Sequence, residues 1–417
     1  MICPTCRRET PADRPFCLNC GAVLPELPPH HDRGGMSLGA RIALFTAGAG
    51  LASLCLLCAG LIVVTEVPDL VGLGLSTILA LIPAVLYVSF ILWIDRYEHE
   101  PAGLLFFAFF WGAVVAIVFS FVFNSVVALI AAQIVGESGG EIAAAVLSAP
   151  VVEEGFKGVF LLLLMLIYRH EFDNVLDGIV YGSIVGLGFA MTENIVYFGR
   201  MYAEGGLAGL ALIVVLRSIL GGFGHALYTG TIGAGFGLAR ESRSLLVKVL
   251  APIAGYLLAV VQHGAWNLIA GTVVPAMLPP ETSEWVYFCL VAPIQSLVLT
   301  GPGLLMLALV VVITWQREAT IIRRMLLPEV ENGLISREDY AILSSSRRRL
   351  RSMWETLRQD GVVALLLRRE YINAATELAF RKWHEERGER PKRDQKHTPE
   401  EQYREKIRRL QARLALE

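Results

Sequence analysis

Eight long apolar runs constrain the fold of this chain more than any other feature of its sequence. A helix needs about 20 predominantly apolar residues to cross the hydrocarbon core of a bilayer, and each run is close to or above that length. The predicted spans are 41–64, 71–94, 104–132, 142–168, 175–198, 208–239, 249–271 and 285–315. The sequence therefore predicts an all-α polytopic membrane protein with about eight transmembrane helices, embedded in a lipid bilayer.

The sixth run, 208–239, is too long for one straight helix. It contains Arg217 and, shortly afterwards, the sequence Gly221-Gly222-Phe223-Gly224. We expect the helix to break there and a second helix to start at about residue 222. Non-helical backbone at membrane depth is tolerated only where it faces protein or water. The break is therefore expected to face the helix bundle or a water-filled space.

Charge separates the chain into an apolar middle and a basic end. Residues 36–316 carry 9 Lys or Arg and 17 Asp or Glu, whereas residues 317–417 carry 23 Lys or Arg and 17 Asp or Glu. With 54% hydrophobic residues, the composition excludes a disordered chain and argues against an ordinary cytosolic enzyme. We expect a membrane-embedded domain over 41–316 and a basic, helical, partly disordered cytosolic tail over 317–417.

Four cysteines near the N-terminus have the spacing of a zinc ribbon. They form two C-x2-C pairs separated by ten residues, namely Cys3, Cys6, Cys17 and Cys20. Two such pairs can hold one tetrahedral Zn²⁺, and four sulfur ligands make that ion structural because no coordination position stays open. The alternative is two disulfides in an oxidising compartment. We predict the ribbon over 1–23 and a Pro- and Gly-containing linker over 24–40.

Positive charge in the short loops predicts the orientation of the chain in the membrane. With the N-terminus inside, only Arg200 falls in an outer loop. The cytosolic loops then hold Arg96, Arg169, Arg240, Arg243 and Lys248. Reduced zinc-binding thiols also belong in the cytosol, and eight spans return the C-terminus to the same side. We therefore predict a multi-pass protein of the cell membrane with both termini in the cytosol.

The predicted tail carries a basic cluster formed by Arg347, Arg348, Arg349 and Arg351. One interpretation is a solvated helix face, and the other is contact with anionic lipid headgroups. Upstream, Ser336 followed by Asp339 resembles the start of a capped helix. Acidic residues are interleaved throughout the tail, so nucleic acid is not expected as a partner.

Ionisable side chains inside the predicted spans are the candidate functional residues, because a charge within a bilayer is costly. Glu153, Glu154 and Lys157 fall in the fourth span. Glu153 and Lys157 are four residues apart and share a helix face, and Glu154 is three residues from Lys157. One lysine can neutralise only one of the two carboxylates. The other carboxylate is therefore expected to be available as a general base.

Three further spans contribute polar side chains at a similar depth, in the outer half to middle of the bilayer. These side chains are Glu193, His225, and His263 with Asn267 four residues later. A divalent metal ion could be held by Glu154, Glu193, His225 and His263, since carboxylates and imidazoles suit zinc. The same groups could also activate water without a metal. The structural alternative is a polar network that only locks the helices together.

In order and spacing, these motifs resemble the PrsW family of intramembrane proteases, which is akin to the CAAX prenyl protease and bacteriocin-processing group. The motifs are EExxK at Glu153–Lys157, FxxxEN at Phe189–Asn194, His225, HxxxN at His263–Asn267, and DRYEHEP at Asp95–Pro101. The resemblance covers roughly residues 95–315. It does not include the cysteine-rich N-terminus or the basic tail.

The resemblance implies roles for individual residues. The implied catalytic set is Glu153, Glu154, Lys157, Glu193, His225, His263 and Asn267. Within it, Glu153 and Glu154 would activate water, and Asn267 would stabilise the oxyanion. Prenyl proteases of the wider group carry histidine where this chain has Glu193, and arginine near the position of Lys157. This departure argues against a prenylated-peptide substrate.

From the motifs and the resemblance we predict an intramembrane endopeptidase, either glutamic or metal-dependent. Its substrate would be a membrane-anchored protein, such as a single-span anti-sigma factor, which implies a role in signalling. One alternative is a proton-coupled transporter or channel, because buried carboxylates and histidines also mark proton relays. Another is a catalytically silent membrane scaffold that recruits partners through its ribbon and tail.

Overall fold

The structure is a computed structural model that describes residues 38–67, 69–95, 97, 100–168, 171–279, 281–386 and 399–415. Helices are the only regular secondary structure in these ranges. The described residues from Cys55 onward belong to one compact unit. The predicted zinc ribbon, with Cys3, Cys6, Cys17 and Cys20, and residues 24–37 of the predicted linker lie outside the described residues.

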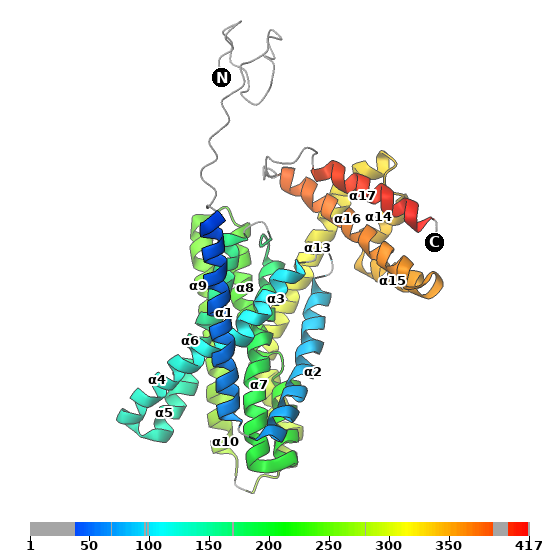
Figure 1. The fold of residues 1–417 in the computed structure, drawn as a ribbon. Coiled ribbons are helices and arrows are strands. Elements are labelled where there is room, and N and C mark those ends of the chain that lie inside the picture. Colours follow the sequence, from blue (N-terminus) through cyan, green and yellow to red (C-terminus); the bar gives the residue numbers. More distant parts are fainter. Residues whose placement is uncertain are drawn as a thin grey trace. The chain divides into compact units, whose positions relative to one another are not determined.

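Between Leu38 and Glu331, the described residues form mainly long α-helices with short π-helical segments (η) (Figure 1). The first elements are α1 Leu38–Glu66, α2 Leu70–Ile94, α3 Ala102–Phe110, η1 Trp111–Ala116, α4 Ile117–Val135, α5 Glu137–Ala143, η2 Ala144–Ser148, α6 Ala149–Ile167, α7 Val175–Val214, η3 Val215–Leu220 and α8 Gly224–Glu241. They are followed by α9 Leu245–Ala265, η4 Trp266–Val273, α10 Val274–Met277, α11 Glu284–Val286, η5 Tyr287–Val291, α12 Ala292–Leu299 and α13 Gly301–Glu331.

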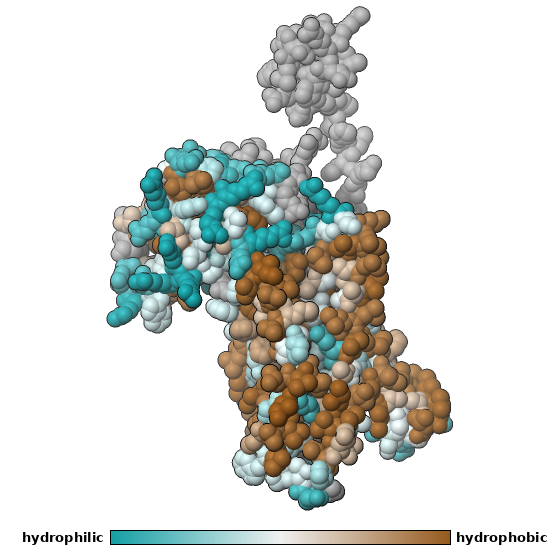
Figure 2. All heavy atoms as spheres, turned by 180° about the vertical axis from the view of Figure 1, so that it is seen from behind, coloured by the Kyte–Doolittle hydropathy of each residue, from teal (hydrophilic) through white to brown (hydrophobic). Residues whose placement is uncertain are grey.

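Six helical segments among the described residues are long and apolar enough to cross a membrane. They are Gly48–Glu66, Leu70–Ile94, Ala102–Val135, Val175–Glu241, Leu245–Met277 and Gly301–Glu331. In hydrocarbon every backbone group must be paired inside the protein, and a helix does this within its own segment. On the face that Figure 2 shows, apolar side chains (brown) cover most of the surface of the membrane-spanning part. The chain is therefore a multi-pass membrane protein.

The predicted spans differ from the structure in two instructive places. The fourth, 142–168, is helical over α5, η2 and α6, but its charged residues exclude it from the six apolar segments. The eighth, 285–315, is not one helix, because α12 ends at Leu299 and α13 begins at Gly301. Pro302 lies in the first turn of α13, where its missing N–H can be tolerated but would interrupt a continuous helix.

The predicted break in the sixth span is confirmed. The π-helical segment η3 ends at Leu220, and α8 begins at Gly224. No loop separates the fifth and sixth predicted spans, 175–198 and 208–239. Helix α7 continues through the residues between them and is kinked at Gly206, whose φ of 60° is in the left-handed region. Glycine adopts this conformation at little cost because it has no Cβ atom.

Helix α7 is the centre of the bundle, since every residue from Leu176 to Phe189 is buried. Its contact with α8 is backbone against backbone. A Cβ atom added at Gly178 would lie 2.0 Å from the Gly233 carbonyl oxygen, and one added at Gly186 would lie 2.2 Å from the His225 carbonyl oxygen. Small residues allow such close helix crossings in membranes. The crossing places the N-terminal turn of α8, including His225, directly against α7.

The C-terminal helices form a second hydrophobic core. They are α14 Arg337–Leu343, α15 Ser346–Gln359, α16 Gly361–Glu386 and α17 Pro399–Leu414 (Figure 1). Their core includes Leu343, Tyr371, Leu378 and Ile407, and it extends onto Ile322 of α13. Helix α13 continues without a break through residue 317, the predicted start of the tail, so the predicted membrane domain and the tail share one helix. The predicted N-cap is present, because Asp339 N donates to Ser336 Oγ at 2.9 Å, but the Asp339 carboxylate accepts from the Ser336 hydroxyl and not from its backbone N–H, so the reciprocal half of a capping box is absent.

The basic cluster predicted on α15 does not form one surface. Arg349 is buried, donates to the Leu343 carbonyl oxygen and to Thr376 Oγ1, both at 2.9 Å, and stacks over Tyr97 at 4.6 Å. Burial lowers the pKa of Arg349 to about 10. This arginine therefore helps to hold the C-terminal helices together, and only its neighbours in the cluster are exposed.

Candidate active site

Helix α6 supplies the carboxylates and the ammonium group at the centre of the site. Glu154 and Lys157 are fully buried, and Glu153 is 7% exposed. Lys157 Nζ lies 2.7 Å from Glu154 Oε1 and 3.6 Å from Glu153 Oε2. The prediction that these three residues share one side of a helix is thus confirmed. Lys157 lies closer to Glu154 than to Glu153. Lys157 Nζ also lies 3.8 Å from the centre of the Phe189 ring of α7.

His225 joins α6 to α7 through both of its ring nitrogens. Its Nδ1 lies 3.1 Å from Lys157 Nζ, and its Nε2 lies 2.9 Å from Glu193 Oε2. Glu193 is also ion-paired with Arg217 of η3, whose Nε donates to Asn194 Oδ1 at 2.7 Å. A carboxylate and an ammonium group beside one imidazole favour the tautomer with the proton on Nε2.

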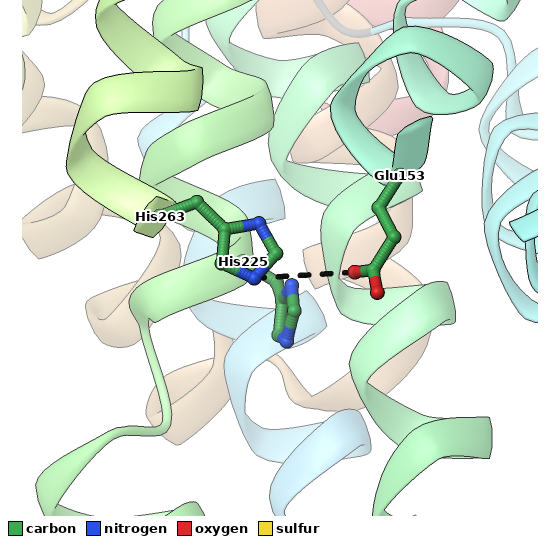
Figure 3. A group of neighbouring side chains, drawn as sticks. All are labelled: Glu153, His225 and His263. Atoms are coloured by element: carbon green, nitrogen blue, oxygen red, sulfur yellow. Dashed lines mark ion pairs between the residues drawn. The ribbon is translucent and has the colours of Figure 1, made fainter. Parts of the chain in front are cut away.

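His263 of α9 contacts both glutamates of α6, and Figure 3 shows it beside Glu153 and His225. Its Nδ1 is 3.1 Å from Glu154 Oε1, and its Nε2 is 4.0 Å from Glu153 Oε2. Because a carboxylate only accepts hydrogen bonds, Glu154 assigns the proton to Nδ1 and leaves the Nε2 lone pair directed towards Glu153. The ring of Tyr228 stacks on His263 with centroids 5.0 Å apart and planes 15° apart.

The two adjacent glutamates have different surroundings. Glu154 accepts from Lys157 Nζ at 2.7 Å and from Thr229 Oγ1 at 2.9 Å, in addition to its contact with His263. Glu153 has one long hydrogen bond, from Asn124 Nδ2 at 3.4 Å to Oε1. Its buried Oε2 has no hydrogen-bond partner and only the longer ion-pair contacts with Lys157 and His263. Glu154 is therefore held in place by its neighbours, whereas Glu153 has an unused acceptor.

A cavity of about 430 Å³ lies beside these groups. Glu153, Glu193, His225 and His263 line it, and Glu154 and Lys157 do not. The π-helical segments η2, η3, η4 and η5 each contribute to its wall. Such segments occur frequently at functional sites because they interrupt the regular helical hydrogen-bond pattern. Polar residues predicted on four different spans thus meet around one cavity.

Comparison with known proteins identifies the family. The sequence model described as PrsW family intramembrane metalloprotease matches residues 100–298. Protease PrsW of Geobacillus kaustophilus (strain HTA426) is 35% identical over 191 residues, which are 45% of this chain and 77% of that protein. The chain belongs to the PrsW family.

Other PrsW relatives match a similar share of the chain. Protease PrsW of Bacillus subtilis (strain 168) is 29% identical over 215 residues, which are 50% of this chain and 84% of that protein. Protease PrsW of Oceanobacillus iheyensis is 30% identical over 191 residues, or 45% of this chain and 79% of that protein. No solved structure matches the chain significantly. The comparisons support a membrane protease, with a membrane protein in the bilayer as its substrate.

The PrsW family is described as metalloproteases, and the site contains donor atoms of the kind that bind a metal ion. Among the described residues, Glu153, His225 and His263 offer ligand atoms that lie within 4.8 Å of one another. One carboxylate and two imidazoles are a known ligand set of catalytic zinc. The unpartnered Glu153 Oε2 and the His263 Nε2 lone pair fit a cation directly. His225 would have to release Lys157 or Glu193.

The sequence-based ligand set differs from this one. It contained Glu154 and Glu193, but Glu154 is already bonded to three neighbours, and Glu193 is paired with Arg217 and His225. The structure groups Glu153 with the two histidines instead.

Asn267 lines the cavity of this PrsW-family protein, but its side chain has a local partner. Its Nδ2 donates to the Ala145 carbonyl oxygen of η2 at 2.8 Å. An amide nitrogen carries two hydrogens, so one donor stays available towards the cavity. The predicted oxyanion contact is compatible with this position, but Asn267 also connects η4 to η2.

Four side chains that contact the glutamates or their neighbours were not predicted as site residues, and Asn124 among them was interpreted as a packing residue. They are Asn124, Ser148, Tyr228 and Thr229. Ser148 Oγ donates to Asn124 Oδ1 at 2.8 Å, and this orients the Asn124 amide towards Glu153. An asparagine in an otherwise apolar span was a usable signal. Serine, threonine and tyrosine are too common in membrane helices to give one.

Proposed function

We propose that this protein is an intramembrane endopeptidase that hydrolyses a peptide bond in a membrane-anchored protein. The observation that supports it most directly is the Glu153 carboxylate. Its Oε2 is buried, has no hydrogen-bond partner and lies 4.0 Å from His263 Nε2 at the wall of the cavity. A carboxylate with a free lone pair in a sheltered space is suited to accept a proton from water.

In this proposal Glu153 is the general base, and Glu154 is a positioning residue. Water beside Glu153 loses a proton to Oε2, and the resulting hydroxide attacks the carbonyl carbon of the scissile peptide. Glu153 then returns the proton to the leaving nitrogen, which departs as an amine. Glu154 holds the His263 ring through Nδ1 and holds Lys157 at 2.7 Å. Lys157 keeps a positive charge close to the carboxylates throughout.

The negative charge that develops on the carbonyl oxygen requires hydrogen-bond donors in the cavity. We propose Tyr228 and Asn267 for this role. The Tyr228 hydroxyl has no hydrogen-bond partner among the described residues, and Tyr228 lines the cavity. Its ring is fixed by stacking on His263. The second amide hydrogen of Asn267 would be the other donor.

A divalent metal ion, where one binds, would be held by Glu153, His225 and His263, and Glu153 would then be a metal ligand and not the proton acceptor. When bound, the ion would polarise the scissile carbonyl and help to activate water. With or without it, Glu154 and Glu193 would have the same task, which is to orient His263 and His225 through the nitrogens that they contact. Such partners of histidine determine both its tautomer and its ring orientation.

The proposed substrate is a single-span regulatory protein such as an anti-sigma factor, and both termini of the enzyme are proposed to face the cytosol. A helix hides its carbonyl groups, so the substrate must unwind locally to reach Glu153. We also propose that Cys3, Cys6, Cys17 and Cys20 hold a structural Zn²⁺. This ribbon and the C-terminal helices lie outside the part of the chain that the family model matches.

The proposal is tested with purified full-length protein and a fluorescent single-span reporter in liposomes. Glu153→Ala and His263→Ala are expected to abolish cleavage while the protein stays folded and membrane-inserted. Glu141→Gln, an exposed glutamate on the same helical stretch, is the control and should cleave normally. If both site variants still cleave, the assignment of the site is wrong. If the wild type cleaves no reporter but carries protons across the liposome membrane, the transporter alternative is correct.

A further inference from the structure

The C-terminal helices carry an apolar face that their own core does not use. Leu350 and Trp354 of α15 and Leu366 of α16 are between 57% and 64% exposed. Leu350 and Trp354 are four residues apart, so they lie on one side of α15. Val362 and Val363, at the start of α16, are exposed in the same part of the chain. On the face that Figure 2 shows, the C-terminal helices are largely hydrophilic.

This apolar face continues the lipid-exposed surface of a membrane span. A groove of about 410 Å³ is lined by Leu350, Trp354 and Leu366 on one side and by Leu92 and Trp93 on the other. Leu92 and Trp93 are exposed residues in the last turn of α2, which is one of the six apolar segments. Tryptophan is enriched at the level of lipid headgroups. The groove therefore lies where the hydrocarbon core gives way to the headgroup region.

The two helices that carry this face also carry unpaired positive charge. Arg347, Arg348, Arg358 and Arg369 are exposed, and none of them has an ion pair among the described residues. Arg369 also lines the groove, next to Asn373. Arg351 is different, because it is paired with Glu355 at 2.7 Å. Arg349 is buried and Arg351 is paired. Of the predicted basic cluster, only Arg347 and Arg348 are therefore exposed and without an ion pair among the described residues.

We propose that the α15–α16 edge rests in the headgroup region of the adjacent leaflet and binds an anionic phospholipid in this groove. The acyl chain lies against Leu350, Trp354 and Trp93, and the phosphate group contacts Arg369. Apolar side chains with arginines beside them are the composition of interfacial helices. A soluble protein partner fits less well, because it would have to displace lipid from the end of α2. The C-terminal helices would thereby be held against the membrane on which the proposed protease acts.

The test uses the full-length chain in phosphatidylcholine nanodiscs that contain increasing amounts of phosphatidylglycerol with brominated acyl chains. Bromine quenches nearby tryptophan fluorescence. In wild type we expect brominated phosphatidylglycerol to quench a part of the tryptophan fluorescence that is absent in Trp354→Phe. Brominated phosphatidylcholine at the same mole fraction should quench this part less. Trp354 is exposed, so its replacement should leave the thermal unfolding midpoint unchanged. Arg369→Gln should weaken the effect of phosphatidylglycerol about fivefold, the contribution of one basic residue near an anionic surface.

Arg337→Gln is the matched control. Arg337 is an exposed arginine at the start of α14 and does not line the groove, so its replacement should leave the quenching unchanged. The proposal is overturned if Trp354→Phe is quenched as strongly as wild type, or if both arginine variants weaken the effect equally. Reversal of quenching by inorganic phosphate in the buffer would identify a free anion as the ligand and would also overturn it.

Discussion

Replacing the two adjacent glutamates one at a time separates catalysis from positioning. In Glu153→Gln the new side chain has nearly the same volume, and the contacts at risk are long, 3.4 Å to Asn124 Nδ2 and 3.6 Å to Lys157 Nζ. We expect the free energy of unfolding to change by less than about 1 kcal/mol, as for a weak hydrogen bond. Cleavage should fall by about 10²–10⁴-fold, which is the usual contribution of a general base.

Glu154→Gln is expected to act mainly on stability. The carboxylate is contacted by three groups, at 2.7 Å, 2.9 Å and 3.1 Å. A glutamine places an N–H group among these donors and leaves Glu153, at 3.6 Å, as the one carboxylate that is ion-paired with the buried Lys157 among the described residues. Neutralising one partner of a buried pair typically costs about 3–5 kcal/mol. Because Glu153 recovers part of the attraction, we expect about 3 kcal/mol and a fall of roughly 6–12 °C in the thermal midpoint.

Both variants are measured in the same detergent, by thermal unfolding and by cleavage of the single-span reporter, with Glu141→Gln as the control. The reasoning predicts an inactive but stable Glu153→Gln protein and a clearly less stable Glu154→Gln protein. It is refuted if Glu153→Gln cleaves at the wild-type rate. It is equally refuted if the two variants lose the same amount of stability, since the hydrogen-bond geometry would then not distinguish them.

Three further predictions concern the helix crossing, the cavity and the loop after α2. Gly178→Ala should prevent normal folding, because its Cβ would lie 2.0 Å from a carbonyl oxygen of α8. Gly205→Ala is the control and should be tolerated, because no atom lies within contact distance of its Cβ. The two variants are compared by their yield of monodisperse protein. Tyr228→Phe should reduce kcat about 10²–10³-fold at an unchanged thermal midpoint, as expected for loss of one oxyanion donor. Burial raises the pKa of Asp95 to about 7, so the folded state keeps a proton that the unfolded state releases near pH 4. The free energy of unfolding should therefore fall as the pH rises from about 4 to about 7. In Asp95→Asn the thermal unfolding midpoint should depend less on pH over this range.

Each of these expectations can fail in a specific way. Normal yield of Gly178→Ala would mean that α7 and α8 do not cross as closely as the structure has them. Full activity of Tyr228→Phe would remove its hydroxyl from the oxyanion site. A wild-type midpoint that is flat, or that rises, between pH 4 and 7 would show that Asp95 does not keep its proton in the folded state.

Local rules were sufficient for much of the fold. Apolar length predicted α1, α2, the α3–α4 stretch and α9, and the glycines at 221–224 predicted where α8 begins. These features depend on the composition of one segment and on backbone flexibility, both of which the sequence contains. The eighth predicted span failed because a hydropathy window does not register one proline at a helix start. The C-terminal core was also not predicted, since it depends on which apolar faces meet.

By itself, the sequence determined which residues are available for chemistry: two adjacent glutamates, a lysine one turn later, and a carboxylate and two histidines on other helices. It also determined the family through their spacing. Only the tertiary structure decided that Glu154 is fully bonded while Glu153 keeps a free oxygen, and that Arg349 is buried while its neighbours are exposed. Distances between side chains on different helices depend on how closely the helices cross. In this protein glycine contacts between α7 and α8 help to set that closeness, and no local pattern encodes it.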